Sequence, residues 1–497
     1  MTPVPKKRRW LVITVGLTLA LVVFVLVARL ALTGMAVRTL LQRAGASEVK
    51  FNVAQASPWH VVMEDIGFQI RTQAFAAKRV TFDRARWWTP SLGAVRVEQV
   101  RLPLDIDGSA TNPWAWSTYK GGAATRQPVN VPLEELSLDG QLIIQAAALP
   151  EQTLTVKIEA RLGPKNTWEG KVQAAGPGLG VKAEGSFDVA KQALAFRVPE
   201  FSLDLKTWQG FVQRLVLLPG GAWDLEGKFT GQAAGRLAGK NLVAGGTVRL
   251  RDGRAAYAQR SIAAEGIEAD LEFTDFDKFI TQPGTLRVRE LRTGQLPLHD
   301  LEAEVAFESA TKFVVSRVSL LALGGKVVAE PFKYFTNLRE LEAVLLVEGV
   351  SVEEVMGLTQ DLPAKAKGRV NGRFPVRIDD SGLRIGTGWL ELKPGVYAEI
   401  QFNANGLLTR GMAANSPSYA VLQKVESGLL KLKIGEMRLD IRPSNAPPGR
   451  SAQLHLVGEP VAPDVKAPVT LDLNVNGPLE KLLNLGLDSR LRFGAKP

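Results

Sequence analysis

The chain has 497 residues and no cysteine, which excludes disulfides, thiolate metal ligands and a thiol nucleophile. Its net charge is +11, but the basic residues are scattered among carboxylates and form no aromatic-interleaved stripe, so we expect no nucleic-acid partner. A chain of this length can bury enough surface to be stable without covalent cross-links.

The first predicted element is a membrane-spanning helix at residues 10–32, WLVITVGLTLALVVFVLVARLAL. Its first 19 residues carry no charge. They would extend about 28 Å as a helix, close to the hydrocarbon thickness of about 30 Å. We expect the following side chains to anchor it in the hydrocarbon: Trp10, Leu11, Val12, Phe24, Leu26 and Leu30.

Basic residues directly before this segment predict its orientation. Lys6, Lys7, Arg8 and Arg9 keep the tail 1–9 in the cytoplasm under the positive-inside rule. The alternative is a cleaved signal peptide, but the apolar stretch is longer than the usual 7–15 residues of a signal core. Either interpretation exports the rest of the chain.

Beyond a short helix expected at residues 33–46, apolar and polar residues alternate, which indicates β-strands with one apolar and one polar side. Clusters of Gly, Asp and Ser are typical of hairpin turns. We therefore predict a long series of antiparallel strands. The clearest strands are 94–107, 153–162, 301–308, 437–442 and 469–476, and the turn clusters are 139–140, 251–253 and 380–382.

A few segments have helical features instead. Residues 206–218 carry apolar side chains at helical spacing, and Ser351 with Glu354 fits a capping box. Pro417 suits the first turn of another helix, which Gly428 would end. Further expected elements are a closing helix at 479–485 and loops at 111–131 and 443–449.

Glycines spaced by four could form a helix-packing motif, at Gly227, Gly231, Gly235 and Gly239. Charged residues intervene, and the same spacing on a strand places every glycine on one side, so we favour a bent strand with a close backbone contact. The GPGLG segment at 176–180 lacks the Lys-Ser/Thr sequel of a phosphate loop, and we interpret it as a turn.

Nothing in the sequence predicts catalysis. The three histidines, His60, His299 and His455, share no metal-ligand spacing, and no Gly-x-Ser-x-Gly elbow occurs. Carboxylates alternate with apolar residues as the polar side of strands would require. We therefore expect no catalytic residues, no metal and no cofactor, and a protein that is not an enzyme.

A succession of short motifs runs through the second half of the chain. They are GTVRLRDGRAAY (246–257), GIEADLEFTDF (266–276), TQPGTLRVRELRTG (281–294), LLALGGKVVAEPF (320–332), VEGVSVEEVMGL (347–358), GRVNGRFPVRIDDSGLRIGTGWLELKPG (368–395) and SYAVLQKVESGLLKLKIGEMRLDI (418–441). In this order they resemble the YdbH family, an AsmA-like group of envelope lipid-transfer proteins that is also labelled "dicarboxylate transport".

The resemblance implies a single-pass inner-membrane protein whose bulk lies in the periplasm. It implies a mainly β fold, in which an elongated antiparallel sheet of repeated elements curves into an apolar groove. Membrane phospholipids would move through this groove toward the outer membrane. The expected regions are the tail 1–9, the membrane helix 10–32, an N-terminal β-rich region 33–220 and the groove region 221–497.

The apolar sides of the predicted strands supply the candidate lipid contacts. They are Val156, Ile158, Val305, Phe307, Leu439, Ile441, Leu471 and Leu473. One alternative is that these sides pack on one another as a sandwich, in an envelope structural or assembly factor without lipid cargo. A weaker alternative is dicarboxylate transport, which would need other membrane subunits because one helix cannot enclose a polar path.

The last predicted strand suggests how a partner could bind. Residues 469–476 lie close to the C-terminus between Pro468 and Pro478, and only Asp472 places a charge inside the strand. A strand at a sheet edge offers unpaired backbone groups to another chain. We therefore expect that an outer-membrane-side protein can add a strand here, unless the following segment covers the edge.

Overall fold

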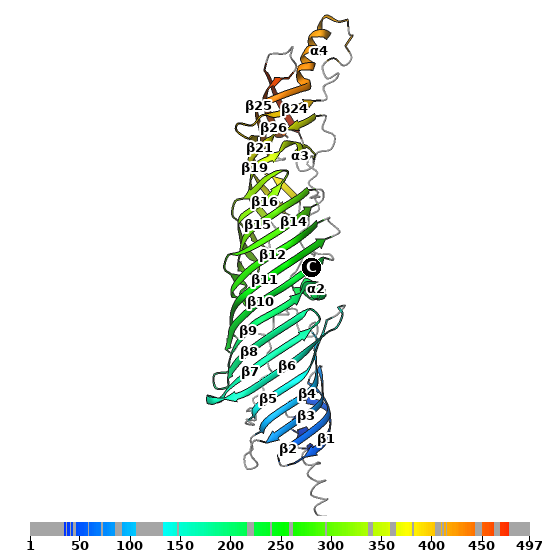
Figure 1. The fold of residues 1–497 in the computed structure, drawn as a ribbon, viewed down its shortest axis with the longest axis vertical. Coiled ribbons are helices and arrows are strands. Elements are labelled where there is room, and N and C mark those ends of the chain that lie inside the picture. The colour runs from blue at the N-terminus through cyan, green and yellow to red at the C-terminus, as the bar shows by residue number, and fades with distance from the viewer. Residues whose placement is uncertain are drawn as a thin grey trace, which may run out of the picture. The chain divides into compact units, whose positions relative to one another are not determined.

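The fold is that of a computed structural model (Figure 1). The predicted membrane helix at 10–32 and the basic residues before it lie outside the described residues. In the part of the chain that is described, no helix is both long enough and apolar enough to cross a membrane. The described residues are 34–35, 37–39, 41–42, 46–57, 59–70, 73–84, 92–105, 133–146, 149–215, 223–238, 241–257, 262–293, 296–335, 341–357, 364–379, 382–402, 409, 412–413, 415–442, 450–461 and 468–476.

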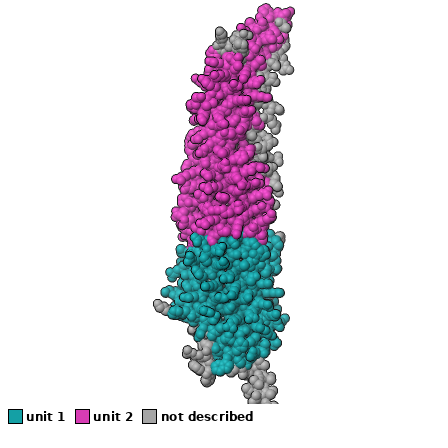
Figure 2. Space-filling model, in the orientation of Figure 1, with its two compact units in different colours: residues 1–203, 232–243 teal, residues 204–231, 244–497 magenta. Residues whose placement is uncertain are grey.

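The described residues form 27 strands of one hydrogen-bonded sheet and a few short helices, which confirms the prediction of a mainly β chain. The chain divides into two compact units (Figure 2). Unit 1 comprises residues 1–203 and 232–243, and unit 2 comprises residues 204–231 and 244–497. Each unit is described by itself.

Unit 1 is a succession of strands in which each pairs with the next along the chain. A short 3-10 helix at Pro164–Asn166 joins two of them. The strands are β1 (Ala46–Ala56), β2 (His60–Ile70), β3 (Gln73–Arg84), β4 (Leu92–Asp105), β5 (Leu133–Gln145), β6 (Gln152–Gly163), β7 (Thr167–Gly176), β8 (Leu179–Asp188) and β9 (Ala193–Asp204).

One pairing in unit 1 corrects the prediction of a purely antiparallel sheet. Strands β4 and β5 are parallel, whereas the other registered neighbours in this unit are antiparallel. Residues 106–132 separate these two strands, and parallel neighbours need a connection of a dozen or more residues to return to the same end of the sheet. The predicted loop at 111–131 lies in this separating segment, outside the described residues.

In unit 2, Figure 1 shows β11, β12, β14, β15 and β16 side by side. Further along, long strands pair with two short strands on one edge, as β16 does with β17 and β18. The elements are α2 (Leu205–Leu215), β10 (Asp224–Ala238), β11 (Asn241–Tyr257), β12 (Ile262–Asp275), β13 (Ile280–Thr281), β14 (Gly284–Thr293), β15 (Leu296–Ser309), β16 (Lys312–Ala322), β17 (Gly325–Ala329), β18 (Phe332–Phe335), β19 (Leu341–Ser351), α3 (Val352–Gly357), β20 (Ala364–Lys367), β21 (Arg369–Asp379), β22 (Gly382–Ile385), β23 (Gly388–Leu392), β24 (Ala398–Phe402), α4 (Pro417–Leu430), β25 (Lys431–Ile441), β26 (Arg450–Pro460) and β27 (Val469–Asn476).

The three predicted interior helices are present, with one corrected end. The Ser351 hydroxyl accepts a hydrogen bond from the Glu354 amide at 3.4 Å, as a capping residue does. Helix α4 begins at Pro417 as predicted, but it continues through Gly428 to Leu430. Its next residue, Lys431, is already extended and opens β25, so this helix end needs no left-handed glycine.

Two of the predicted hairpin turns are wrong. Residues 139–140 lie inside β5 and residues 251–253 lie inside β11. A Cβ on Gly140 would lie 2.3 Å from the Val100 carbonyl oxygen, so glycine is needed here because β4 and β5 approach closely. Asp252 has a φ of +50° at a register shift, which identifies a bulge. The predicted turns at 176–180 and 380–382 do join hairpins.

Asp204 caps helix α2, and we predict that Asp204→Ala lowers the free energy of unfolding by about 1 kcal/mol. Its carboxylate accepts hydrogen bonds from the Thr207 amide and hydroxyl, both at 2.8 Å. These hydrogen bonds hold the pKa of Asp204 below its usual range, and the bond from the Thr207 amide has the larger effect. A carboxyl with a lowered pKa stabilises the folded state above its unfolded pKa of about 3.9, and this contribution is lost as the pH falls through the folded value.

Denaturant titration of wild type, Asp204→Ala and Asp204→Asn checks this prediction. Asparagine caps a helix about as well as aspartate but does not titrate. The Ala variant should therefore have a lower free energy of unfolding than the wild type at neutral pH, and the difference should shrink below about pH 4. An Asn variant as unstable as the Ala variant at pH 7 would contradict a capping role.

Candidate functional site

The apolar side of the sheet in unit 1 is built from rows of directly paired residues. Paired residues on neighbouring strands project to the same side of a sheet, with Cβ atoms about 4.5–5.5 Å apart. One such row runs from β1 to β8 and consists of Val53, Met63, Val80, Val97, Leu138, Ile158, Val172 and Ala183.

Two further rows lie beside the first, and none of the three contains a charged or polar side chain. Together they make an apolar surface that extends over strands β1 to β9. The second row is Ala56, Val61, Phe82, Val95, Leu136, Ala160, Gly170, Gly185 and Phe196, and the third is Ile66, Ala77, Val100, Gly140, Val156, Ala174, Val181 and Phe201.

The opposite, polar side of unit 1 carries rows in which positive and negative side chains are interspersed. One row reads Arg96, Ser137, Glu159, Lys171, Glu184 and Arg197, and its neighbour reads Asp139, Lys157, Gln173, Lys182 and Glu200. A hydrogen bond from Lys157, 2.7 Å away, lowers the pKa of Glu159. The charged residues in these rows are exposed, so this side is suited to water.

The rows of unit 1 are packed differently along their length. On β2 to β4 the apolar residues form a buried cluster that includes Met63, Ile66 and Val80. On β6 to β8 the same rows carry small residues such as Ala160, Gly170 and Ala174, which are half-buried. Apolar surface therefore remains reachable at the half-buried positions of β6 to β8, although Val156 of β6 is buried.

Unit 2 has an apolar row of the same kind. It connects strands that are far apart in the sequence and runs from β16 to β27 without a charged residue. Its members are Leu320, Val327, Val347, Gly372, Leu390, Leu439, Leu454 and Leu473.

The structure places the eight predicted groove residues on apolar sides, in three groups. Val156 and Ile158 lie in the unit 1 rows. Val305 belongs to a buried cluster against which Phe307 packs. The third group consists of Leu439, Ile441, Leu471 and Leu473 on β25 and β27, of which Leu439 and Leu473 share the partner Leu454 on β26. Contact of these residues with lipid stays a prediction.

Near the end of unit 2 the apolar side is filled by its own residues. Leu432, Ile434 and Leu456 have no exposed surface, and they join residues of β20, β23 and β24 in one cluster. Leu471 packs against this cluster. Within this cluster, little apolar surface is left exposed to a ligand.

Unit 2 also contains a set of aromatic residues that was not predicted from the sequence, which we call the aromatic run. It consists of Phe273, Phe276, Phe279, Phe307, Phe313 and Tyr334, whose rings touch one another in succession. The spacing in FTDFDKF (273–279) was the only sequence signal, and it could not reveal contacts with β15, β16 and β18.

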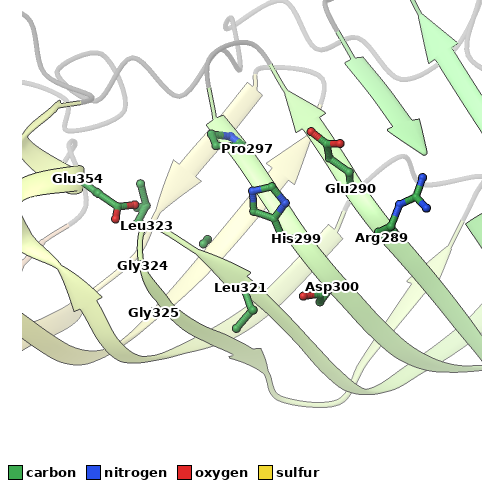
Figure 3. A pocket seen from close by; sticks show the side chains of 11 residues that line it. Arg289, Glu290, Pro297, His299, Asp300, Leu321, Leu323, Gly324, Gly325 and Glu354 are labelled. Carbon is green, nitrogen blue, oxygen red and sulfur yellow. The ribbon is translucent and has the colours of Figure 1, made fainter. Parts of the chain in front are cut away.

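Charged and apolar residues line an open cavity of about 660 Å³ in unit 2, between β14, β15, α3 and the β16–β17 turn (Figure 3). Arg289, His299, Asp300, Leu321 and Glu354 contribute to it. His299 pairs with Glu290 and Leu321, and the neighbours of Leu321 along β16, Leu320 and Ala322, belong to apolar pairings. His299 and Leu321 therefore line the cavity from the polar side, whereas Ala322, which also lines it, belongs to an apolar pairing.

The histidines do not come together. His60 Nδ1 lies 2.6 Å from a carboxylate oxygen of Asp83, and His455 Nδ1 lies 2.7 Å from one of Asp472. Within the described ranges, no group of three or more His, Asp or Glu side chains could hold a metal ion. The site that the geometry offers is thus an extended apolar surface with a charged reverse side.

Comparison with known proteins adds one match. The model of the family YdbH-like, described as "Intermembrane phospholipid transport protein YdbH", matches residues 27–395. No curated protein and no solved structure matches the chain. The matched range includes β1 to β23 and the aromatic run, whereas β24, α4 and β25 to β27 follow it. The "dicarboxylate transport" label and the AsmA-like grouping stay expectations.

Proposed function

Because this chain belongs to the YdbH-like family of intermembrane phospholipid transport proteins, we propose that the apolar side of its sheet carries phospholipid acyl chains. The observation that carries this proposal is the continuity of the apolar rows, which pass from β1 to β9 in unit 1 without a charge. Acyl chains gain about 25 cal/mol for each Å² of apolar surface removed from water, so many weak contacts suffice and no single binding residue is needed.

The polar side supports the same proposal. Its charged rows keep one side of the sheet in water while the other side holds the acyl chains, and headgroups would stay at the edges where both can be satisfied. Such a device needs no bond-making step, so we propose that the chain is not an enzyme and uses no cofactor.

We further propose that the chain is a single-pass inner-membrane protein, held by the segment 10–32, with its bulk in the periplasm. The uncharged length of that segment and the four basic residues before it support this topology. Transfer toward the outer membrane, the phospholipid partner and the inner-membrane partner are parts of the same proposal.

A partner protein on the outer-membrane side would join β27 by strand addition. Strand β27 is registered against β26 along one edge, and no described strand is registered against its other edge. The predicted closing helix at 479–485 lies outside the described residues.

Lipid analysis of the purified full chain tests the main proposal. We expect phospholipid to co-purify with the chain from membranes that were solubilised and then washed free of excess detergent. A control chain of similar size with a single membrane helix but no exposed apolar sheet should carry only annular lipid, lost at the same detergent concentration. A full chain that retains no more phospholipid than this control would rule the proposal out.

A further inference from the structure

The aromatic run is continuous in space although its residues come from five places in the sequence. Phe273 contacts Phe276 and Phe279, with ring centroids 4.7 and 5.1 Å apart. Phe279 then meets Phe307 edge-on at 5.1 Å. Phe307 contacts Phe313 at 5.4 Å, and Phe313 contacts Tyr334 at 5.0 Å.

The run lies on the apolar side of unit 2, at one edge. Phe273 is near the end of β12, Phe307 is near the end of β15, and Phe313 is near the start of β16. Antiparallel pairing brings these strand ends together along one border of the sheet, where the strands begin and end. Phe307 and Phe313 also pack against the buried cluster of Val305 and Val315. The run therefore borders the apolar surface on which acyl chains would lie.

Phe279 differs from the other members of the run in its backbone. Its φ is +57°, a conformation that glycine or asparagine adopts readily and a bulky aromatic residue rarely does. The turn before it is held by Asp275, whose carboxylate accepts a hydrogen bond from the Lys278 amide at 3.1 Å and lies 3.1 Å from the Lys278 ammonium. The hydrogen bond from the Lys278 backbone amide is the largest cause of the lowered pKa of Asp275.

The strained backbone holds a ring that is not buried. The side chain of Phe279 is 37% exposed, while Phe273, which it touches, is buried. The ring contacts Phe273 and Phe307 yet stays partly exposed, so packing alone does not account for a strained phenylalanine where glycine would fit more easily. The exposed part of the ring adds to the border of the apolar surface.

We propose that the aromatic run is the side wall of the lipid groove in unit 2, and that Phe279 is a lipid-contacting residue that retains acyl chains. This inference rests on the proposed function. The occupant is the acyl part of a phospholipid, because Phe279 and its ring neighbours Phe273 and Phe307 offer only apolar surface and continue the apolar side. Asp275 is a positioning residue, since it orders the turn and makes no contact with the lipid.

Photo-crosslinking tests the contact directly. The photoreactive amino acid p-benzoylphenylalanine replaces Phe279, Phe187 or Leu321 in the full chain, in cells whose phospholipids carry ³²P. Phe187 is 37% exposed on the apolar side of unit 1, and Leu321 is 45% exposed on the polar side of β16. We expect labelled adducts at positions 279 and 187 and only background at position 321.

The three positions separate the possible failures. An adduct at 187 without one at 279 would overturn the inference and leave the proposed function standing. Background at both 187 and 279 would overturn both. Equal labelling at all three positions would show non-specific capture and would overturn the inference as well.

Substitution of the ring tests retention. We expect Phe279→Gly, which also relieves the backbone strain, to release bound phospholipid on the order of tenfold faster, as loss of one aromatic contact predicts. Phe279→Trp should restore slow release. The melting temperature of the Gly variant should not fall, so an unstable Gly variant with unchanged lipid release would show that the ring serves the fold and would overturn the inference.

Discussion

Replacing Val172 with glutamate is expected to remove most of the phospholipid bound by the chain, about tenfold or more. Val172 lies in the first apolar row of unit 1, paired with Ile158 on β6 and Ala183 on β8. It is half-buried, so the variant can fold with its carboxylate turned toward water. The carboxylate would then stand where acyl chains lie, and an ionised group in an apolar environment costs several kcal/mol.

The neighbouring residue supplies a matched control. Gln173 follows Val172 on β7 but projects to the polar side, where it pairs with Lys157 and Lys182. The variant Gln173→Glu adds the same charge between two lysines and should leave both bound phospholipid and the melting temperature nearly unchanged. Bound phospholipid would be measured by mass spectrometry on both variants. Equal loss of phospholipid in the two variants would contradict the proposal that only the apolar side of the sheet binds lipid.

The sequence predicted the strands well because alternation depends only on neighbouring residues. The segment 469–476 became β27 with the predicted bounds, and residues 153–162 lie within β6. Helix α2 was found in the same way, from apolar spacing at 206–218. Local patterns of this kind indicate which side of a helix or strand faces water, and this does not depend on which other strands it pairs with.

Features that depend on pairing between distant strands could not be predicted in this way. Asp139-Gly140 has the composition of a hairpin turn, but the close approach of Val100 from β4 explains the glycine inside a strand. The aromatic run likewise depends on the register of β15 with β16. The eight candidate groove residues were chosen from local alternation, whereas the cluster around Leu432 depends on contacts between β20, β24 and β25.

Proline in the last strand is expected to abolish capture of a partner strand while the chain stays folded. Proline has no backbone N–H, so it removes one donor from whichever edge that N–H faces. Neighbouring residues of a strand direct their N–H groups to opposite edges. Leu473→Pro and Asn474→Pro therefore affect different edges of β27, one paired with β26 and the other open to a partner.

The two variants show which edge of β27 binds the partner. Hydrogen exchange of the β26 amides shows which variant has lost its donor at the edge paired with β26. The variant that leaves β26 protected has lost a donor at the open edge, and it should lose the partner in envelope crosslinking by about tenfold or more, because an added strand depends on main-chain hydrogen bonds. The other variant should loosen β26 and is the control for general damage to the edge. If the variant with protected β26 captures its partner normally, strand addition does not occur at β27, and the segment that follows it covers the edge.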